Sequence, residues 1–259
     1  MKYSIVNGER KEAFPSGIGT CEVCNQPTLA KCGSRKVHHW AHSSLLECDK
    51  WWESETEWHR NWKNKFPLEW QERVHRDEIS GELHRADVKT EDNLVIEFQN
   101  SSISYEEQIS RQDFYKKMIW IVNGVKFKKS FNVLNQLPNP QDEFVRDIQF
   151  QPKRRNSFGM FFFRHSLNPD LANPKFEGQA FLISDIKEIE IQIEESYIGH
   201  HLYHWSNPRK NWLSGESKVF IDFGDDNLYY LMNYSNEYKL SVVRIYSKKE
   251  ILKRLLKEG

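Results

Sequence analysis

Aromatic residues recur every four positions in one short stretch near the start of the second fifth of the chain. Trp58, Trp62 and Phe66 lie on one face if this stretch is helical, because residues four apart in a helix are neighbours. Ser54 and Glu57 have the spacing of a capping box, which predicts that the helix begins at Ser54. The proline after Phe66 predicts where it ends.

A second stripe of the same helix carries polar side chains that can do chemistry. Glu55, His59 and Lys63 are also four residues apart, on a face next to the aromatic one. The pattern therefore predicts a helix with one face in the core and an adjoining face that presents an acid, an imidazole and an amine.

The pattern after this helix predicts strands and then a second helix. Ser104 and Glu107 repeat the capping-box spacing and begin a helix that runs to about Lys117. The predicted strands are 68–74, 84–89, 94–99 and 118–122. The expected order is helix, three strands, helix, strand, which indicates a mixed α/β (α+β) fold.

The chain divides into three stretches by this pattern. Residues 1–50 show little periodicity, residues 51–135 hold the predicted core, and residues 136–259 begin near a proline-containing linker candidate, LPNPQD. The last stretch is predicted to contain strands and a final helix opened by Ser247 and Glu250. Its predicted strands are 176–184, 189–193, 219–223 and 228–232. The pattern indicates no role for this C-terminal region.

Two acidic residues are predicted to face each other across one hairpin. Glu91-Asp92-Asn93 has turn chemistry, and a turn centred on Asp92 places Asp87 opposite Glu97, with Gln99 on the same face. Facing acids repel unless a cation binds between them, and oxygen ligands suit Mg²⁺ or Mn²⁺. The alternative is an exposed hairpin whose acids are simply solvated.

Residues near this pair add further candidates for the same chemistry. Glu55 is a candidate further metal ligand, directly or through water, and Gln99 could orient a water or a phosphate. His84 precedes Asp87 by three residues and is a candidate to contact phosphate or to shuttle a proton.

All four cysteines lie in the first fifth of the chain, which favours a metal site over disulfides. Cys21 and Cys24 have the spacing with which two thiolates hold one Zn²⁺, and His39 and His42 supply a second close pair. We expect these four residues to form a structural zinc site. Three further residues are candidate ligands and leave the ligand set open: Cys32, Cys48 and His38. The alternative is that the thiols are free and buried and the imidazoles lie on the surface.

Composition limits the classes of function only weakly. The formal net charge is zero, with 37 basic and 37 acidic residues, which weighs against a protein that coats nucleic acid through overall positive charge. Apolar runs are too short to span a membrane, and the N-terminus has no apolar signal segment, so we expect no membrane association and a cytoplasmic location.

Several strings, taken in order, resemble the competence protein CoiA-like family. In that family a strand ending in A-D-V is followed by a strand reading I-E-x-Q-x-S, and the upstream motifs also correspond. The matching pieces here are HHWAH (38–42), E-x-x-x-H-x-x-x-K (Glu55, His59, Lys63), HRADV (84–88), VIEFQNSSIS (95–104) and R-x-x-x-Y (Arg111, Tyr115). The resemblance covers roughly residues 18–124.

The resemblance implies a restriction-endonuclease-like αβββαβ core, similar to the PD-(D/E)XK nuclease superfamily. It implies a catalytic set of Asp87, Glu97 and Gln99 with support from Glu55, and DNA as the partner. The family's N-terminus also looks like a zinc knuckle. The superfamily more often has lysine where Gln99 stands, and Lys63 could supply the replacement charge.

Four further residues are predicted near the substrate. Arg111 and Tyr115 lie one turn apart on the second helix, where they would hold phosphate and stack or hydrogen-bond. Lys63 and His59 face the same site from the first helix. The alternative for Arg111 and Tyr115 is an exposed arginine over a half-buried tyrosine.

Three functions remain open from the sequence. The first is a Mg²⁺-dependent deoxyribonuclease, and the second is a catalytically inactive DNA-binding factor in DNA uptake or recombination, which the glutamine at position 99 motivates. The third is a zinc-stabilised protein-interaction module in which residues 140–259 form the binding part.

Overall fold

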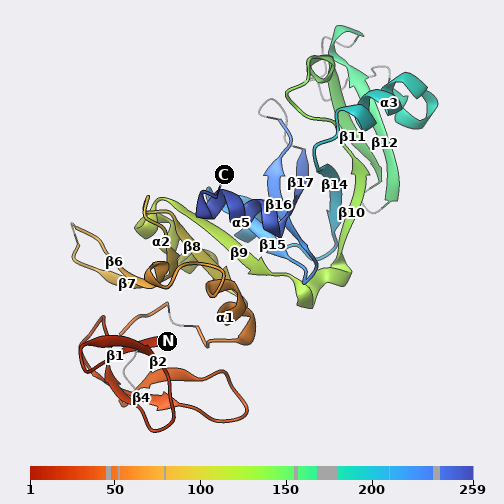
Figure 1. The fold of residues 1–259 in the computed structure, drawn as a ribbon. Coiled ribbons are helices and arrows are strands. Elements are labelled where there is room, and N and C mark those ends of the chain that lie inside the picture. Colours follow the sequence, from red (N-terminus) through yellow and green to blue (C-terminus); the bar gives the residue numbers. More distant parts are fainter. Residues whose placement is uncertain are drawn as a thin grey trace. The chain divides into compact units, whose positions relative to one another are not determined.

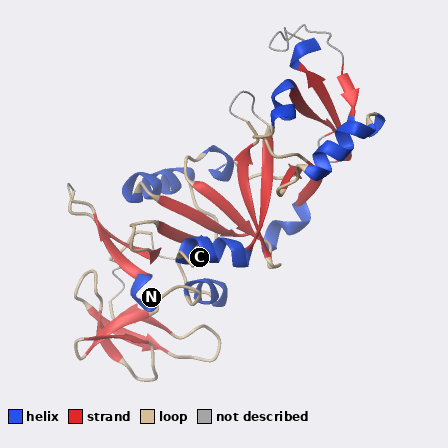
Figure 2. Ribbon diagram, turned by 45° about the horizontal axis from the view of Figure 1, so that its top comes forward, coloured by secondary structure: helices blue, strands red, loops and turns tan. Residues whose placement is uncertain are grey.

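The computed structural model describes residues 1–44, 48–51, 53–78, 80–154, 157–167, 180–209, 211–235 and 240–258. The chain forms two compact units: unit 1 is Met1–Asn123 with Ser214–Val219, and unit 2 is Gly124–Leu213 with Phe220–Gly259. Helices and strands occur in both (Figure 2), so the mixed α and β class is confirmed. The predicted boundaries near residues 50 and 135 stay a prediction.

Unit 1 begins with a five-stranded antiparallel sheet of strand order β2-β1-β3-β4-β5. Its strands β1, β2 and β4 are labelled in Figure 1. Asn7 and Gly8 have φ angles of 52° and 81°, which suit the two central residues of a tight hairpin turn. The low periodicity of residues 1–50 gave no indication of these strands. The strands are β1 (Tyr3–Val6), β2 (Glu9–Glu12), β3 (Ile18–Thr20), β4 (Pro27–Lys31) and β5 (His39–His42).

The second part of unit 1 has the predicted element order. Strands β6, β7 and β8 are antiparallel neighbours, and β9 is parallel to β8. The 3-10 helix η1 (Leu68–Trp70) precedes β6. The elements are α1 (Glu57–Lys63), β6 (Gln71–Arg76), β7 (Leu83–Lys89), β8 (Val95–Gln99), α2 (Tyr105–Tyr115) and β9 (Met118–Asn123).

The predicted helix caps were right for α2 and two residues early for α1. Ser104 caps α2, and its hydroxyl accepts from the Glu107 N–H at 3.1 Å. The cap of α1 is Thr56 rather than Ser54, because the His59 side chain completes a capping box with Thr56. The Ser54 spacing was therefore coincidental.

The aromatic stripe of α1 packs onto one residue of β8. The Trp62 ring is stacked on the Phe98 ring at a centroid distance of 5.7 Å, and the Trp58 and Phe66 rings each lie 6.2 Å from it. Burying a side chain of this size contributes about 1.5–3 kcal/mol. This contact fixes the helix against the strand that carries Glu97.

Unit 2 combines two groups of strands with three α-helices among the described residues. Its strands in the larger group follow the order β10-β14-β17-β16-β15, and the smaller sheet has the order β11-β12-β13. The strands are β10 (Phe131–Gln136), β11 (Ile148–Arg154), β12 (Ser157–Arg164), β13 (Ala180–Leu182), β14 (His200–Trp205), β15 (Lys218–Asp222), β16 (Asn227–Asn233) and β17 (Ser241–Ser247). The helices are α3 (Lys187–Glu195), α4 (Asn211–Ser214) and α5 (Lys248–Leu256), with 3-10 turns η2 (Val125–Ser130), η3 (Glu143–Asp147), η4 (His165–Leu167) and η5 (Ile183–Asp185).

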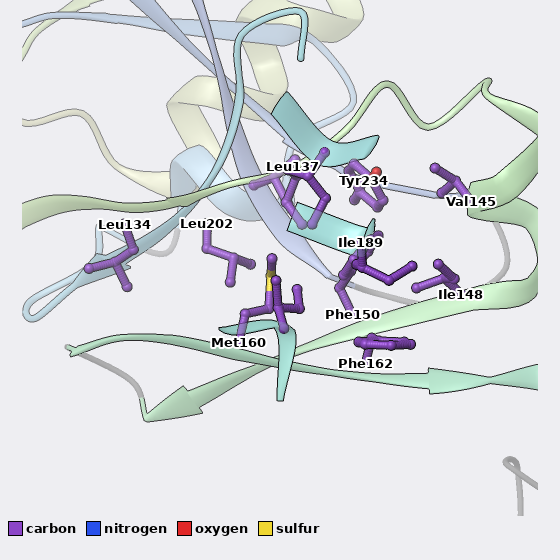
Figure 3. Close-up of a cluster of buried hydrophobic side chains, with 13 residues drawn as sticks. Leu134, Leu137, Val145, Ile148, Phe150, Met160, Phe162, Ile189, Leu202 and Tyr234 are labelled. Carbon is purple, nitrogen blue, oxygen red and sulfur yellow. The ribbon is translucent and has the colours of Figure 1, made fainter. Parts of the chain in front are cut away.

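The core of unit 2 explains one wrong prediction. The segment 189–193 was expected to be a strand, but it lies inside helix α3. Ile189, labelled in Figure 3, and Ile193 are buried in one apolar cluster, whereas Ile191 is 43% exposed. A strand would place all three isoleucines on one face, whereas a helix places only the residues four apart together. The other predicted strands are observed in part or in full: residues 68–70 form η1 instead, residues 183–184 lie in η5, and residues 176–179 lie outside the described residues.

No helix in the described part of the chain is both long enough and apolar enough to cross a membrane.

Candidate functional site

The two predicted carboxylates meet where strands β7 and β8 stop pairing. The register is the predicted one, since Val88 pairs with Ile96. Beyond this pair, the Asp87 N–H donates to Glu97 Oε1 at 3.1 Å, and the Phe98 N–H donates to Asp87 Oδ2 at 3.0 Å. Each carboxylate is therefore fixed by a backbone N–H of the opposite strand, and the two acids are held close together.

Glu97 is a buried acid with an unfavourable charge. Burial and the nearby Asp87 carboxylate raise the pKa of Glu97 to about 8, although the Arg111 guanidinium opposes the shift. Arg111 Nη1 lies 2.9 Å from Glu97 Oε2, and the same guanidinium also contacts Glu107 Oε1 and donates to the Trp51 carbonyl. Arg111 thus faces the carboxylate centre, and its positive charge is paired with Glu97 and Glu107.

Asp87 has a basic partner on the other predicted helix. The side chain of Lys63 is 2% exposed, and its Nζ lies 2.6 Å from Glu55 Oε2, 2.9 Å from Glu72 Oε1 and 3.5 Å from Asp87 Oδ1. Burial opposes a charged amine, but these three carboxylates raise the pKa of Lys63. Lys63 is therefore an ammonium held by three acids. Burial also raises the pKa of Asp87, against the opposing charges of Lys63 and His59.

Glu72 is a member of this centre that sequence reasoning missed. Its carboxylate accepts from Lys63 and also from the Lys2 and Tyr3 N–H groups of the N-terminal sheet, at 2.7 Å and 3.3 Å. Although burial opposes the charge, the Lys63 ammonium holds the pKa of Glu72 well below its usual range. Its φ of 48° is strained for a residue with a side chain, at a cost of about 1–3 kcal/mol. An acid inside a strand carries no sequence signal for such a position.

His59 links α1 to β8. The Thr56 N–H donates to Nδ1 at 3.3 Å, so the ring proton is on Nε2, which donates to the Phe98 carbonyl at 2.9 Å. Burial lowers the pKa of His59, but the Glu53 and Asp87 carboxylates outweigh it and raise the pKa overall. Glu53 Oε2 lies 3.4 Å from Nε2. Sequence reasoning missed Glu53 as well.

Gln99 is directed toward Glu53. Its Nε2 donates to Glu53 Oε2 at 3.2 Å, and Glu53 Oε1 accepts from the Ser101 N–H at 2.7 Å. Gln99 is 3% exposed. The amide therefore fixes a neighbouring acid in a buried position.

His84 and Tyr115 belong to a neighbouring aromatic cluster. The His84 ring is stacked on Trp51, and its two nitrogens lie 2.8 Å from Asp49 Oδ1 and 2.9 Å from Glu82 Oε1. Tyr115 is 4% exposed and packs near the same Trp51 ring. Both side chains are committed to partners inside the protein.

Some of the predicted site residues line one small cavity, which has a volume of about 70 Å³. This volume holds a metal ion with one or two waters, given that a water occupies about 30 Å³ in the liquid. Gln99, His84 and Tyr115 do not line it, whereas Glu53 and Glu72 do. The predicted residues that line it are Glu55, His59, Lys63, Asp87, Glu97 and Arg111.

A second cluster contains potential metal ligands from the turn that follows Cys21, from strand β5 and from the segment that contains Cys48. The ligand atoms of Cys21, Cys24, His42 and Cys48 all lie within 4.8 Å of one another. Cys21 and Cys48 Sγ are 3.8 Å apart, and Cys24 Sγ lies 3.3 Å from His42 Nε2. A tetrahedral site with zinc–sulfur bonds of about 2.3 Å separates two sulfurs by about 3.8 Å. The four residues therefore fit a Cys₃His zinc site.

Cys48 occupies the place that was predicted for His39. His39 and His42 are three residues apart on strand β5, and residues separated by an odd number point to opposite faces of a strand. His39 instead bonds through Nδ1 to the Val37 carbonyl at 2.8 Å. The histidine pair was read as two ligands because β5 was not foreseen. The structure places neither Cys32 nor His38 in this group.

The pKa values of two thiols in this cluster are shifted in opposite directions. Burial raises the pKa of the Cys21 thiol, but the Cys24 N–H and the Arg85 guanidinium outweigh it and lower the pKa to about 6. Burial and the neighbouring Cys21 raise the pKa of Cys48 to about 12. A bound Zn²⁺ would allow all three sulfurs to be thiolates, because it supplies the positive charge that they share.

Replacement of Lys63 tests the buried charge cluster. Lys63→Met leaves three carboxylates without their shared ammonium, so we expect the free energy of unfolding in urea to fall by about 3–5 kcal/mol. Lys65→Met, an exposed position just beyond the same helix, should leave the stability near that of the unaltered protein. Equal stabilities of the two variants would contradict the assigned cluster.

Zinc content distinguishes the two ligand sets. We expect one zinc per chain in protein purified without chelators, loss of most of it in Cys48→Ser, and retention in His39→Ala. Elemental analysis of the three proteins provides the measurement. Loss of zinc in His39→Ala with retention in Cys48→Ser would reverse the assignment.

Comparison with known families finds a match for a segment that begins in unit 1 and continues into unit 2. Residues 59–166, less than half of the chain, match the family model described as competence protein CoiA, nuclease-like domain. No curated protein and no solved structure matches the chain. The matched segment begins within α1 and contains Lys63, Asp87, Glu97 and Arg111. The predicted resemblance is therefore confirmed for this segment: residues 59–166 are similar to the nuclease-like domain of the competence protein CoiA family.

Proposed function

We propose that this protein is a nuclease that hydrolyses DNA phosphodiester bonds with the help of a divalent metal ion held by Asp87 and Glu97. The observation that carries the proposal is the pair of carboxylates at the end of the β7–β8 ladder, each fixed by a backbone N–H of the opposite strand. The nuclease-like family of this segment supports it.

The donor set suits Mg²⁺ or Mn²⁺. Asp87 and Glu97 offer hard oxygen ligands, and the pKa of each is raised because its charge is unfavourable where it lies. A cation between them would relieve that penalty. When bound, the ion would activate a water and stabilise the charge that develops on the phosphate.

The remaining residues of the cavity position these two acids. Lys63 holds Asp87 from the α1 side, and Arg111 holds Glu97 from α2. Lys63 would also provide the site with the amine that the PD-(D/E)XK superfamily, which the sequence resembles, more often carries at the position of Gln99. Glu55 was predicted as a further metal ligand. Its carboxylate accepts from the Lys63 ammonium and holds that group in place.

Conservative substitutions test the proposed metal ligands. Asp87→Asn and Glu97→Gln keep size and hydrogen-bonding capacity but remove charge, so each should lower Mg²⁺- or Mn²⁺-dependent cleavage of DNA by about 100-fold or more. Glu91→Gln, an exposed acid in the turn of the same hairpin, is the matched control and should cleave normally. Cleavage rates on single- and double-stranded DNA are measured with each metal and with chelator.

The same proteins show whether the assignment fails. Unchanged cleavage in Asp87→Asn would remove these acids from the site. Calorimetric titration with Mn²⁺ adds a measurement that does not depend on activity, and we expect binding in the unaltered protein and in Glu91→Gln but weaker binding in the two centre variants.

A second function is favoured by one observation. Gln99 is bonded to Glu53, and the Lys63 amine that lines the cavity is enclosed by three acids. An inactive nuclease fold that binds DNA in uptake or recombination would retain this arrangement. DNA binding that persists in chelator, together with no cleavage under any metal condition, would favour it.

A further inference from the structure

An open cavity lies beside the carboxylate centre, between two segments of unit 1. It has a volume of about 500 Å³. One wall is the loop between β4 and β5, residues 34–37, and the other is the segment 54–57 that leads into α1. Glu55 lines both this cavity and the smaller one that contains Asp87 and Glu97. The two cavities therefore adjoin at Glu55.

The loop that forms the outer wall is held in place from α1. Arg60 Nη2 donates to the His38 carbonyl at 2.8 Å, and Arg60 Nε contacts Glu55 Oε1 at 3.2 Å. Arg60 thus connects the end of the loop, at His38, to Glu55, which lines both cavities. The loop is a fixed wall of the cavity, positioned by a side chain that is only 12% exposed.

The loop carries two exposed cations, Arg35 and Lys36. Neither has an ion pair with any residue that the structure describes. The bases nearer the centre differ, because Arg60, Lys63 and Arg111 are each bonded to carboxylates. Arg35 and Lys36 are consequently the charges beside this cavity that remain available to an incoming anion.

The centre itself needs such charges if it is to act on a phosphodiester. Acids dominate it, and their field repels a phosphate until cations near its entrance offset that repulsion. The net charge of the whole chain is zero, so attraction of a polyanion has to come from a local group of bases.

From this placement we propose that Arg35 and Lys36 bind the phosphate backbone of a nucleic-acid strand and lead it past Glu55 to the carboxylate centre. The inference rests on the proposed nuclease function and assigns the substrate contact to the N-terminal sheet, outside the matched nuclease-like segment. The contact is electrostatic, so it would not select a base sequence.

The test measures the affinity for labelled DNA by fluorescence anisotropy in chelator, over a range of salt concentrations. Arg35→Ala/Lys36→Ala should weaken binding about tenfold and reduce the slope of log affinity against log salt by about 1.4–1.8, as expected for the loss of two phosphate contacts. Arg35→Lys/Lys36→Arg should restore most of the affinity, because charge rather than shape is required. Single-stranded and duplex DNA of the same sequence serve as separate probes.

The matched control removes two exposed lysines elsewhere in the chain. Lys126→Ala/Lys129→Ala, in η2, makes the same change in net charge and should leave affinity and salt slope unchanged. Equal losses in both double variants, or an unaltered slope in Arg35→Ala/Lys36→Ala, would overturn the inference. So would the absence of DNA binding by the unaltered protein.

These outcomes can be separated from failure of the proposed function. If the unaltered protein cleaves DNA and the loop variant binds as tightly as before, only the inference fails. If the protein binds DNA through the loop but no metal supports cleavage, the phosphate contact of Arg35 and Lys36 is upheld and the nuclease proposal fails.

Discussion

The Lys63 ammonium is the interaction on which the candidate site depends. It is buried, and a buried charge is tolerated only when it is paired and hydrogen-bonded. Its three acidic partners come from the segment before α1, from β6 and from β7. Since the β6 partner, Glu72, also accepts from the backbone of β1, the same charge joins the N-terminal sheet to the nuclease-like core. One side chain thus fixes the relative position of four segments within unit 1.

The two carboxylates of the centre have counter-charges on different helices. Asp87 is near the ammonium on α1, and Glu97 bonds to the guanidinium on α2. Both acids still have raised pKa values, so these partners compensate the cost of burial only in part. The arrangement keeps the pair in place, and the proposed divalent cation would offset the cost that remains.

The sequence predicted features that depend on local periodicity. The helix stripe that packs on Phe98, the cap at Ser104 and the register of the β7–β8 hairpin all follow from spacing within a few residues. Features that depend on tertiary contacts were missed. Glu53 and Glu72 resemble solvated acids in sequence, and only folding shows that Glu72 is buried beside Lys63 and that Glu53, half-buried, lies beside His59. His39 was grouped with His42 because their separation is short, although a strand points them apart.

Arg85 lies between the cysteine cluster and the carboxylate centre and links the two electrostatically. Its guanidinium contacts Cys21 Sγ at 3.4 Å, and the Glu72 carboxylate raises its pKa against the effect of burial. A relative that loses the cysteine cluster would leave this arginine with a buried positive charge and one anionic neighbour fewer. The carboxylate centre therefore depends in part on the cysteine cluster, because the anions of both stabilise the charge of one arginine.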